Sequence, residues 1–361
     1  MLRTYVATCL LLVCNAVFAQ SFTVDNIKYE VLDGGNEVAI AGFEDETQTT
    51  LMPPEKVTFE GQEYAVTVIG DNAFSDCSQL TSVHIPSTVT KIGTRSFYNC
   101  YRLSQIQFPE GLTTIGYLAF CCCSSLTQVQ FPEGLTSIDH LAFKACSNLS
   151  QVKFPESLTS IGASAFESCD NLEAINVDSE NCYYSSLDGI LYNKDKTVIR
   201  ICPNSKENVF LPNGVKIIGK YAFAHNYKLK NITISSEVET IDEYAFQYCS
   251  GLDSITIPGN VKKISKYAFQ HCSKLTKIIL SEGLTTIDDW AFSGCKKIEE
   301  ITFPSSIQTL GSVLFCNCTQ LVNIYCKAKN PPTIHHQTFD LLIEERVPTI
   351  YVPMESIYKY K

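Results

Sequence analysis

Hydrophobic residues recur along this chain with a period of 23 residues. Phenylalanine marks each copy, in two series of five: Phe74, Phe97, Phe120, Phe143 and Phe166, then Phe223, Phe246, Phe269, Phe292 and Phe315. Hydrophobic residues also stand eight and five residues before each phenylalanine, and six, nine and eleven residues after it. At the chain's 45% hydrophobic content, roughly half of these sites would otherwise be polar. The pattern therefore specifies a core.

The repeat predicts a solenoid, because one 23-residue unit cannot bury six large side chains alone and copies must stack around a shared core. Residues 103–108 alternate apolar and polar as a strand does, and Pro109 and Gly111 then turn the chain. Residues 112–115 form a second extended segment, after which we expect a short helical or 3₁₀ turn that carries Phe120. The predicted fold is a strand-rich α/β repeat solenoid of about ten short coils.

This unit resembles the BspA-like class of leucine-rich repeats, which reads approximately Leu-x-x-Ile-x-Ile-Pro-x-x-Val-x-x-Ile-x-x-x-Ala-Phe-x-x-Cys. The similarity covers residues 66–327 and implies a leucine-rich-repeat-like stack. Between Phe166 and Phe223 the spacing is 57 residues, which is 34 more than one period. The segment from Tyr183 to Asn193 within this insert resembles the extended hairpin repeat of the family.

The chain divides into six predicted segments. They are a signal peptide (1–19), an N-terminal β cap (20–65), repeats 1–5 (66–178), the hairpin insertion (179–214), repeats 6–10 (215–327) and a C-terminal cap (328–361). The signal peptide is indicated by Arg3, an apolar run and a small residue, Ala19, before the cleavage point. Because the chain ends at Lys361, earlier than the family's closing element, we expect the C-terminal cap to be incomplete.

The N-terminal cap is predicted from three short strand patterns, at residues 22–24, 29–31 and 37–40. Residues 33–36, Asp-Gly-Gly-Asn, form the turn between the last two strands. Acidic residues 44–46 supply the polar outer face that a terminal unit of a solenoid needs.

Composition and charge narrow the functional classes. The chain has 38 acidic and 28 basic residues, a net charge of −10, and removal of residues 1–19 changes this to −11. A nucleic-acid partner is unexpected, since such proteins present a basic face to phosphates. No segment after residue 19 approaches the length of a membrane span. We therefore expect a protein that is secreted or held at the cell surface.

Nine of the 17 cysteines stand three residues after a repeat phenylalanine, and Asn226 takes this place in the remaining copy. Stacked equivalent positions lie ~4.8 Å apart, farther than the ~3.8 Å between the β-carbons of a disulfide. The exchange with asparagine indicates a small inward group that bonds to the backbone. For Cys182 and Cys202, which bracket the hairpin, a disulfide remains an open alternative.

The sequence predicts neither catalysis nor a bound cofactor or metal. Zinc-type Cys-x-x-Cys pairs are absent from it, as are the Gly-x-Ser-x-Gly nucleophile motif and glycine-rich nucleotide-binding motifs. A regular stack of coils also lacks the deep, water-excluding pocket that activates catalytic side chains.

Two sets of residues are candidates for binding a partner. The first lies on the outward sites of the first strand and comprises Gln105, Gln107, Gln128, Gln130, Gln151 and Lys153. These amides either solvate and register the strands or form a flat polar surface for a protein or glycan. The second set, on the hairpin, comprises Tyr183, Tyr184 and Tyr192, which we expect to be exposed and to stack their rings on sugars.

Residues alone predict an extracellular repeat scaffold with an extended interaction surface. The family resemblance implies adhesion to host or cell-surface glycoproteins, including those of the extracellular matrix. The alternative function is that of a glycan-capturing accessory protein in a surface nutrient-acquisition system. Affinity for polysaccharide would distinguish the second function.

Overall fold

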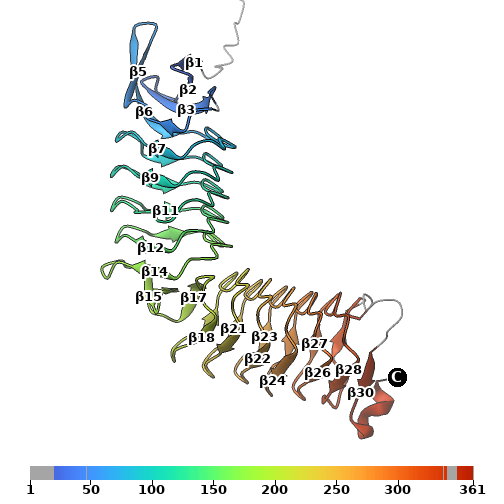
Figure 1. Ribbon diagram of the computed structural model, residues 1–361. Coiled ribbons are helices and arrows are strands. Elements are labelled where there is room, and N and C mark those ends of the chain that lie inside the picture. Colours follow the sequence, from blue (N-terminus) through green and yellow to red (C-terminus); the bar gives the residue numbers. More distant parts are fainter. Residues whose placement is uncertain (1–19, 46, 336, 340–347, 361) are drawn as a thin grey trace, which may run out of the picture.

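The computed structural model describes residues 20–45, 47–335, 337–339 and 348–360. Its chain forms a strand-rich solenoid of about twelve turns, close to the predicted number, that bends once into an L shape (Figure 1). We call residues 66–178 the N-terminal arm, residues 215–327 the C-terminal arm, and residues 179–214 between them the elbow. The predicted signal peptide lies outside the described residues. Within them, no helix is long and apolar enough to cross a membrane.

The N-terminal end of the solenoid is closed by a β cap, as predicted. Its strands are β1 (Ser21–Val24), β2 (Ile27–Val31), β3 (Glu37–Phe43), β4 (Thr50–Leu51), β5 (Lys56–Phe59) and β6 (Gln62–Ile69). Strands β1, β2 and β3 pair antiparallel, and β3 then pairs in parallel with β6. The antiparallel β5–β6 hairpin was not expected from the sequence. Strand β6 runs across the predicted boundary at residue 65 and carries the cap into the first coil.

Most coils contribute one strand to each of two rows. The first-strand row comprises β7 (Ser82–His84), β9 (Gln105–Gln107), β12 (Gln151–Phe154), β14 (Ala174–Val177), β18 (Asn208–Phe210), β20 (Asn231–Thr233), β22 (Ser254–Ile257), β24 (Lys277–Leu280), β26 (Glu300–Phe303), β28 (Asn323–Cys326) and β30 (Thr349–Tyr351). The second-strand row comprises β8 (Lys91–Ile92), β10 (Thr114–Ile115), β11 (Ser137–Ile138), β13 (Ser160–Ile161), β19 (Ile217–Ile218), β21 (Thr240–Ile241), β23 (Lys263–Ile264), β25 (Thr286–Ile287), β27 (Thr309–Leu310) and β29 (Thr333–Ile334).

The two rows differ in continuity. The second strands pair in parallel from coil to coil within each arm, with Ile115 beside Ile92 and Ile138. The first strands instead form several short sheets. One interruption follows β9, where the next coil contributes only a single bridge, between Gln128 and Gln151. Another separates β24 from β26.

The corner between the second and first strands holds the phenylalanine stack. Phe120 packs between Phe97 and Phe143, with ring centroids 5.0 and 5.1 Å away. The corner is a succession of tight turns, so the expected helical or 3₁₀ turn is wrong. Leu118 and Cys122 on either side have positive φ angles of 54° and 65°, which a right-handed helix cannot accommodate.

The elbow is built by three antiparallel strands, β15 (Tyr184–Leu187), β16 (Ile190–Asn193) and β17 (Val198–Ile201). Its turn residues Asp188 and Gly189 have φ of 51° and 76°, as a type I′ hairpin requires. Strand β16 is buried on both faces: Leu191 packs into the core of the N-terminal arm, and Ile190 and Tyr192 into that of the C-terminal arm. One strand thus separates two hydrophobic cores.

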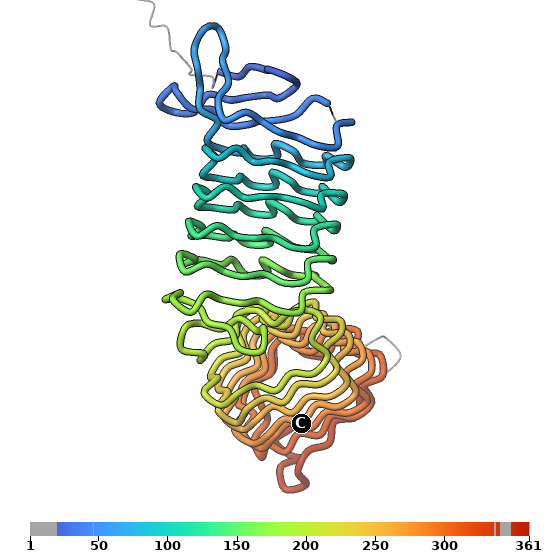
Figure 2. Tube along the Cα trace, turned by 60° about the vertical axis from the view of Figure 1, so that its left-hand side comes forward, coloured from blue at the N-terminus to red at the C-terminus, as the bar shows by residue number. Residues whose placement is uncertain are grey.

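Figure 2 shows the same bend from another direction, with the C-terminal arm viewed almost along its axis. The C-terminal end carries the 3₁₀ helix η1 (Met354–Lys359) after β30. Tyr360 fixes this segment, because its hydroxyl donates to the carbonyl of Ala328 at 2.7 Å. Residues 336, 340–347 and 361 of the predicted C-terminal cap lie outside the described residues.

Candidate functional site

The first set of predicted partner-binding residues lies on the outer surface of the N-terminal arm. Gln105 and Gln107 flank the inward-facing Ile106 on β9, and Gln151 and Lys153 flank the buried Val152 on β12. Gln128 and Gln130 lie on the intervening coil, on either side of the buried Val129. All six polar side chains are exposed because strand alternation directs every second residue away from the core. We call this set the glutamine face.

The glutamine side chains of this face do not form a hydrogen-bonded row. Among the described residues, no group forms a hydrogen bond with the side-chain amide of Gln105, Gln107, Gln128, Gln130 or Gln151. By contrast, Asn231 donates to Asn208 of the preceding coil at 2.9 Å. The side-chain amides of the glutamine face therefore do not register the strands, and their donors and acceptors remain available to a partner.

Two shallow grooves indent the glutamine face. One, of about 480 Å³, is lined by His84, Gln105, Gln107 and Gln128 together with residues of β4. The other, of about 380 Å³, lies between Gln107 and Gln130 and is bounded by Glu110 and Glu133. Both lie where strand pairing is interrupted after β9. A surface of this shape can accommodate an extended ligand without enclosing it.

The hairpin tyrosines are placed differently from the prediction. Tyr183 is 54% exposed, but Tyr184 and Tyr192 are only 8% and 1% exposed, so their predicted availability for sugar stacking is wrong. The Tyr184 hydroxyl accepts from the backbone N–H of Ile161 at 3.2 Å and so replaces a strand partner for β13. Tyr192 lies in the core of the C-terminal arm, where burial raises its pKa to about 12. The hairpin strands build the elbow and do not form an aromatic binding surface.

The repeat cysteines hydrogen-bond to the backbone. Eight of the nine donate from Sγ to the carbonyl of the phenylalanine 26 residues earlier, as Cys123 does to Phe97 at 3.1 Å. Equivalent bonds are formed by Cys100, Cys146, Cys169, Cys249, Cys272, Cys295 and Cys318. Asn226 fills the same place with an amide that donates to the carbonyls of Pro203 and Lys206. The predicted structural role is confirmed.

No disulfide links any of the fifteen described cysteines, so Cys182 and Cys202 are not bridged. Cys182 is exposed, whereas Cys202 is buried. No group of three or more histidine, cysteine, aspartate or glutamate side chains in the described part of the chain is arranged to hold a metal ion.

Where the arms meet, a small ionic network joins them, which sequence reasoning missed. Glu167 of the N-terminal arm is almost buried and accepts from Lys144 at 2.6 Å. Its carboxylate also lies 3.4 Å from Nε2 of His225 in the C-terminal arm. Nδ1 of His225 is 2.7 Å from the Tyr227 hydroxyl. Burial lowers the pKa of His225, and Lys144 acts in the same direction, while Glu167 opposes it.

The repeat model for the BspA type leucine rich repeat region matches residues 67–187 and 201–340. The chain belongs to the BspA-type leucine-rich repeat family. The two matched ranges end and resume at the elbow, where the hairpin interrupts the 23-residue period. No curated protein matches this chain significantly.

Solved structures with the same fold include several bacterial leucine-rich repeat proteins. A leucine rich cell surface protein from Faecalibacterium prausnitzii A2-165 is 28% identical, with 90% of this chain and 97% of that chain aligned at a TM-score of 0.59. A leucine-rich repeat protein from Bacteroides ovatus is 27% identical over 87% and 89% of the two chains, with a TM-score of 0.50.

The pneumococcal vaccine antigen PcpA is similar in fold. It is 23% identical over 94% of this chain and 86% of that chain, with a TM-score of 0.63. These structures share the leucine-rich repeat fold of this BspA-type chain.

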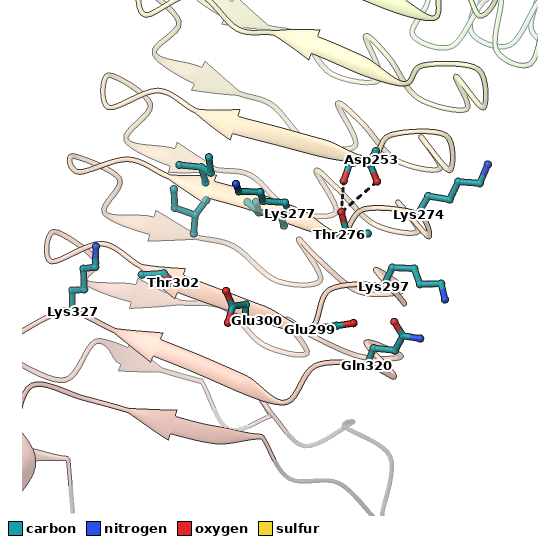
Figure 3. Close-up of a pocket in the computed structure, with 13 residues that line it drawn as sticks. Asp253, Lys274, Thr276, Lys277, Lys297, Glu299, Glu300, Thr302, Gln320 and Lys327 are labelled. Atoms are coloured by element: carbon teal, nitrogen blue, oxygen red, sulfur yellow. Dashed lines mark hydrogen bonds between the residues drawn. The ribbon is translucent and has the colours of Figure 1, made fainter.

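The C-terminal arm of this BspA-type protein carries a larger groove that the sequence did not predict. It occupies about 990 Å³ along β24 and β26, and four lysines are among its lining residues (Figure 3). Their positions in the repeat, five residues after Phe269 and Phe292 for Lys274 and Lys297, were the available sequence signal.

Proposed function

We propose that this protein is a secreted or cell-surface leucine-rich repeat protein that binds glycoproteins of a host or of another cell through its glutamine face. The observation that supports this most is the row of exposed amides without intramolecular hydrogen bonds on three consecutive coils. Each amide offers both donors and acceptors, which match the peptide groups and sugar hydroxyls of a glycoprotein. Leucine-rich repeat proteins generally use such extended surfaces for protein interaction.

The shape of the surface favours binding over catalysis. The grooves at the glutamine face are open and lined by neutral amides, with Glu110 and Glu133 at one edge. Activated nucleophiles and acid–base pairs are usually found in enclosed sites with perturbed carboxylates or imidazoles. We therefore infer a non-catalytic role, in which contact is distributed over several coils.

Export to the cell surface is part of the proposal. The sequence pattern of residues 1–19 supports it, with its basic residue, apolar run and small residue before the cleavage point. The similarity to the cell surface protein of Faecalibacterium prausnitzii supports it independently. Attachment to extracellular matrix glycoproteins, adhesion in the strict sense, is the form of binding that we propose.

The proposal is tested by measuring binding of residues 20–361 to immobilised fibronectin, laminin, collagen and mucin by biolayer interferometry. Enzymatically deglycosylated samples of each, with serum albumin as a negative control, separate protein from glycan recognition. We expect saturable binding to at least one matrix glycoprotein. If the protein binds none of them although circular dichroism shows that it is folded, the proposed function is contradicted.

A further inference from the structure

The groove of the C-terminal arm lies where the first-strand row is interrupted. Strands β22 and β24 form one short sheet and β26, β28 and β30 another, so β24 and β26 are neighbours without ladder pairing. The resulting depression has a volume of about 990 Å³. Its charged and polar lining residues are four lysines, three acidic residues, Thr302 and Gln320: the lysines are Lys274, Lys277, Lys297 and Lys327, and the acidic residues are Asp253, Glu299 and Glu300. The interruption creates room for a ligand on an otherwise flat row.

The four lysines of the groove lie outside the ion pairs of this arm. All four are exposed, and none forms an ion pair with a carboxylate of the described residues. Five other lysines of the same arm do form such pairs: Lys216, Lys220, Lys230, Lys263 and Lys266. Of the seven lysines of this arm that form no ion pair with a described carboxylate, four therefore line one groove.

This local concentration contrasts with the charge of the rest of the chain. Residues 20–178 contain 20 acidic and 7 basic residues, whereas residues 215–327 contain 10 acidic and 12 basic ones. An acidic protein repels polyanions in general, so an anionic ligand would be directed to the C-terminal arm. The unpaired lysines would then fix it at the groove.

The arrangement of the side chains fits a chain-like ligand. Figure 3 shows Lys274 and Lys297 along one side of the groove, Lys327 at the opposite end and Glu300 between them. Separated cations suit acidic groups that repeat along a chain. The carboxylate of Glu300 and the hydroxyl of Thr302 suit the sugar hydroxyls between those groups. The carboxylates of Asp253 and Glu299 also line the groove, and Asp253 accepts from the Thr276 hydroxyl at 3.3 Å.

We propose that this groove binds an acidic oligosaccharide, in which carboxylate or sulfate groups contact the four lysines. The inference rests on the proposed function, since it assigns a glycan class to a protein proposed to bind glycoproteins. It adds a second binding surface, on the other arm from the glutamine face.

The test is calorimetric titration of residues 20–361 with three hexasaccharides. Hyaluronan supplies carboxylates alone, heparin supplies sulfates as well, and maltohexaose is neutral. We expect binding of one or both acidic hexasaccharides that weakens as salt is raised, and no binding of maltohexaose. Which acidic probe binds identifies the anionic group that is recognised.

Two variants decide whether the groove is responsible. In the groove variant, Lys274→Gln, Lys277→Gln, Lys297→Gln and Lys327→Gln are combined, and we expect the dissociation constant to rise about tenfold or more. The control variant, Lys216→Gln, Lys220→Gln, Lys230→Gln and Lys266→Gln, loses the same charge from paired lysines and should stay within about twofold of the parent. Equal weakening in both variants, or no binding of either acidic probe, overturns the inference. If matrix glycoprotein binding persists in that case, the proposed function still stands.

Discussion

At the scale of single residues, each position of the repeat has one structural role, and chemically different side chains can fill that role. Cys123 and Asn226 occupy equivalent places, and both donate to backbone carbonyls of the preceding turn. Their burial and bonding were predictable because the exchange of thiol for amide requires a small donor. The ionic network of Glu167 and His225 was not predictable, since it joins residues of different coils through the bend.

The phenylalanine stack should dominate stability. Phe143 is fully buried between Phe120 and Phe166, at ring-centroid distances of 5.1 and 5.3 Å. Phe143→Ala should lower the free energy of unfolding by about 3–5 kcal/mol through lost burial and the cavity left behind. Phe210→Ala is the matched control, because Phe210 is 77% exposed, and it should change stability little. Denaturant titration measures both, and equal midpoints would show that the register is misassigned.

The cysteines should react according to their burial. In folded protein, Cys182 should be labelled rapidly by an electrophile and the half-buried Cys122 and Cys316 more slowly. The other twelve are buried, and burial raises the pKa of thiols such as Cys121, to about 12, which suppresses the reactive thiolate. After unfolding without reductant, mass spectrometry should find all fifteen labelled. Unlabelled pairs at that stage would reveal disulfides and contradict the assignment of unbridged cysteines.

The contact between the two arms should weaken in acid through His225. Because burial lowers the pKa of folded His225 below the unfolded value of about 6.5, the unfolded chain binds more protons. The contribution of neutral His225 is therefore present above about pH 6.5 and is lost as pH falls toward the lowered pKa. Denaturant stability measured at pH 7.5 and pH 5.0 should fall more for the parent than for His225→Gln. Identical losses in the two proteins would exclude this role.

At the scale of elements, the sequence predicted the coils, the cap and the hairpin, because their signals are local. Alternating residues such as those of β9 and the Asp188-Gly189 turn specify strands and a hairpin directly. The prediction of a helical turn was wrong because residues with a left-handed backbone conformation, such as Leu118, interrupt it. The prediction that Tyr192 is exposed was also wrong. The sequence of a strand that is buried on both faces resembles that of an exposed hairpin, and only the two enclosing cores distinguish them.

Removing the insertion should straighten the molecule. Deletion of residues 178–211 takes out 34 residues and joins Val177 to Pro212, which restores the 23-residue spacing between the two phenylalanine series. The second-strand row could then pair without interruption, as it does within each arm. Small-angle X-ray scattering should report a longer maximum dimension despite the shorter chain. A shorter or unchanged dimension, with the variant folded, would show that the hairpin does not cause the bend.

At the scale of the whole molecule, the bend gives the protein two arms with different surfaces. The N-terminal arm and its cap are acidic and carry the glutamine face, whereas the C-terminal arm carries the lysine-lined groove. The stack as a whole was predictable from periodicity, but the direction of the second arm was not. It depends on how β16 packs between two cores, which no local pattern encodes.

The claim that the glutamine face binds the partner is tested most directly by making this face negatively charged. Gln107→Glu, Gln130→Glu and Lys153→Glu together place three carboxylates on consecutive coils of an acidic protein. The matched control is Lys91→Glu, Thr114→Glu and Ser137→Glu, which makes the same charge change on consecutive coils of the second-strand row. Both variants should remain folded, since none of the six side chains contributes to the core.

The measurement is the affinity of the parent and both variants for the matrix glycoprotein that the parent binds, by biolayer interferometry with each protein's thermal unfolding recorded alongside. The account predicts that the glutamine-face variant loses binding, because the new carboxylates repel an acidic glycoprotein and remove amide donors, while the control variant retains it. Retained binding by the glutamine-face variant, or equal loss in both, would contradict the assignment of this face as the binding site.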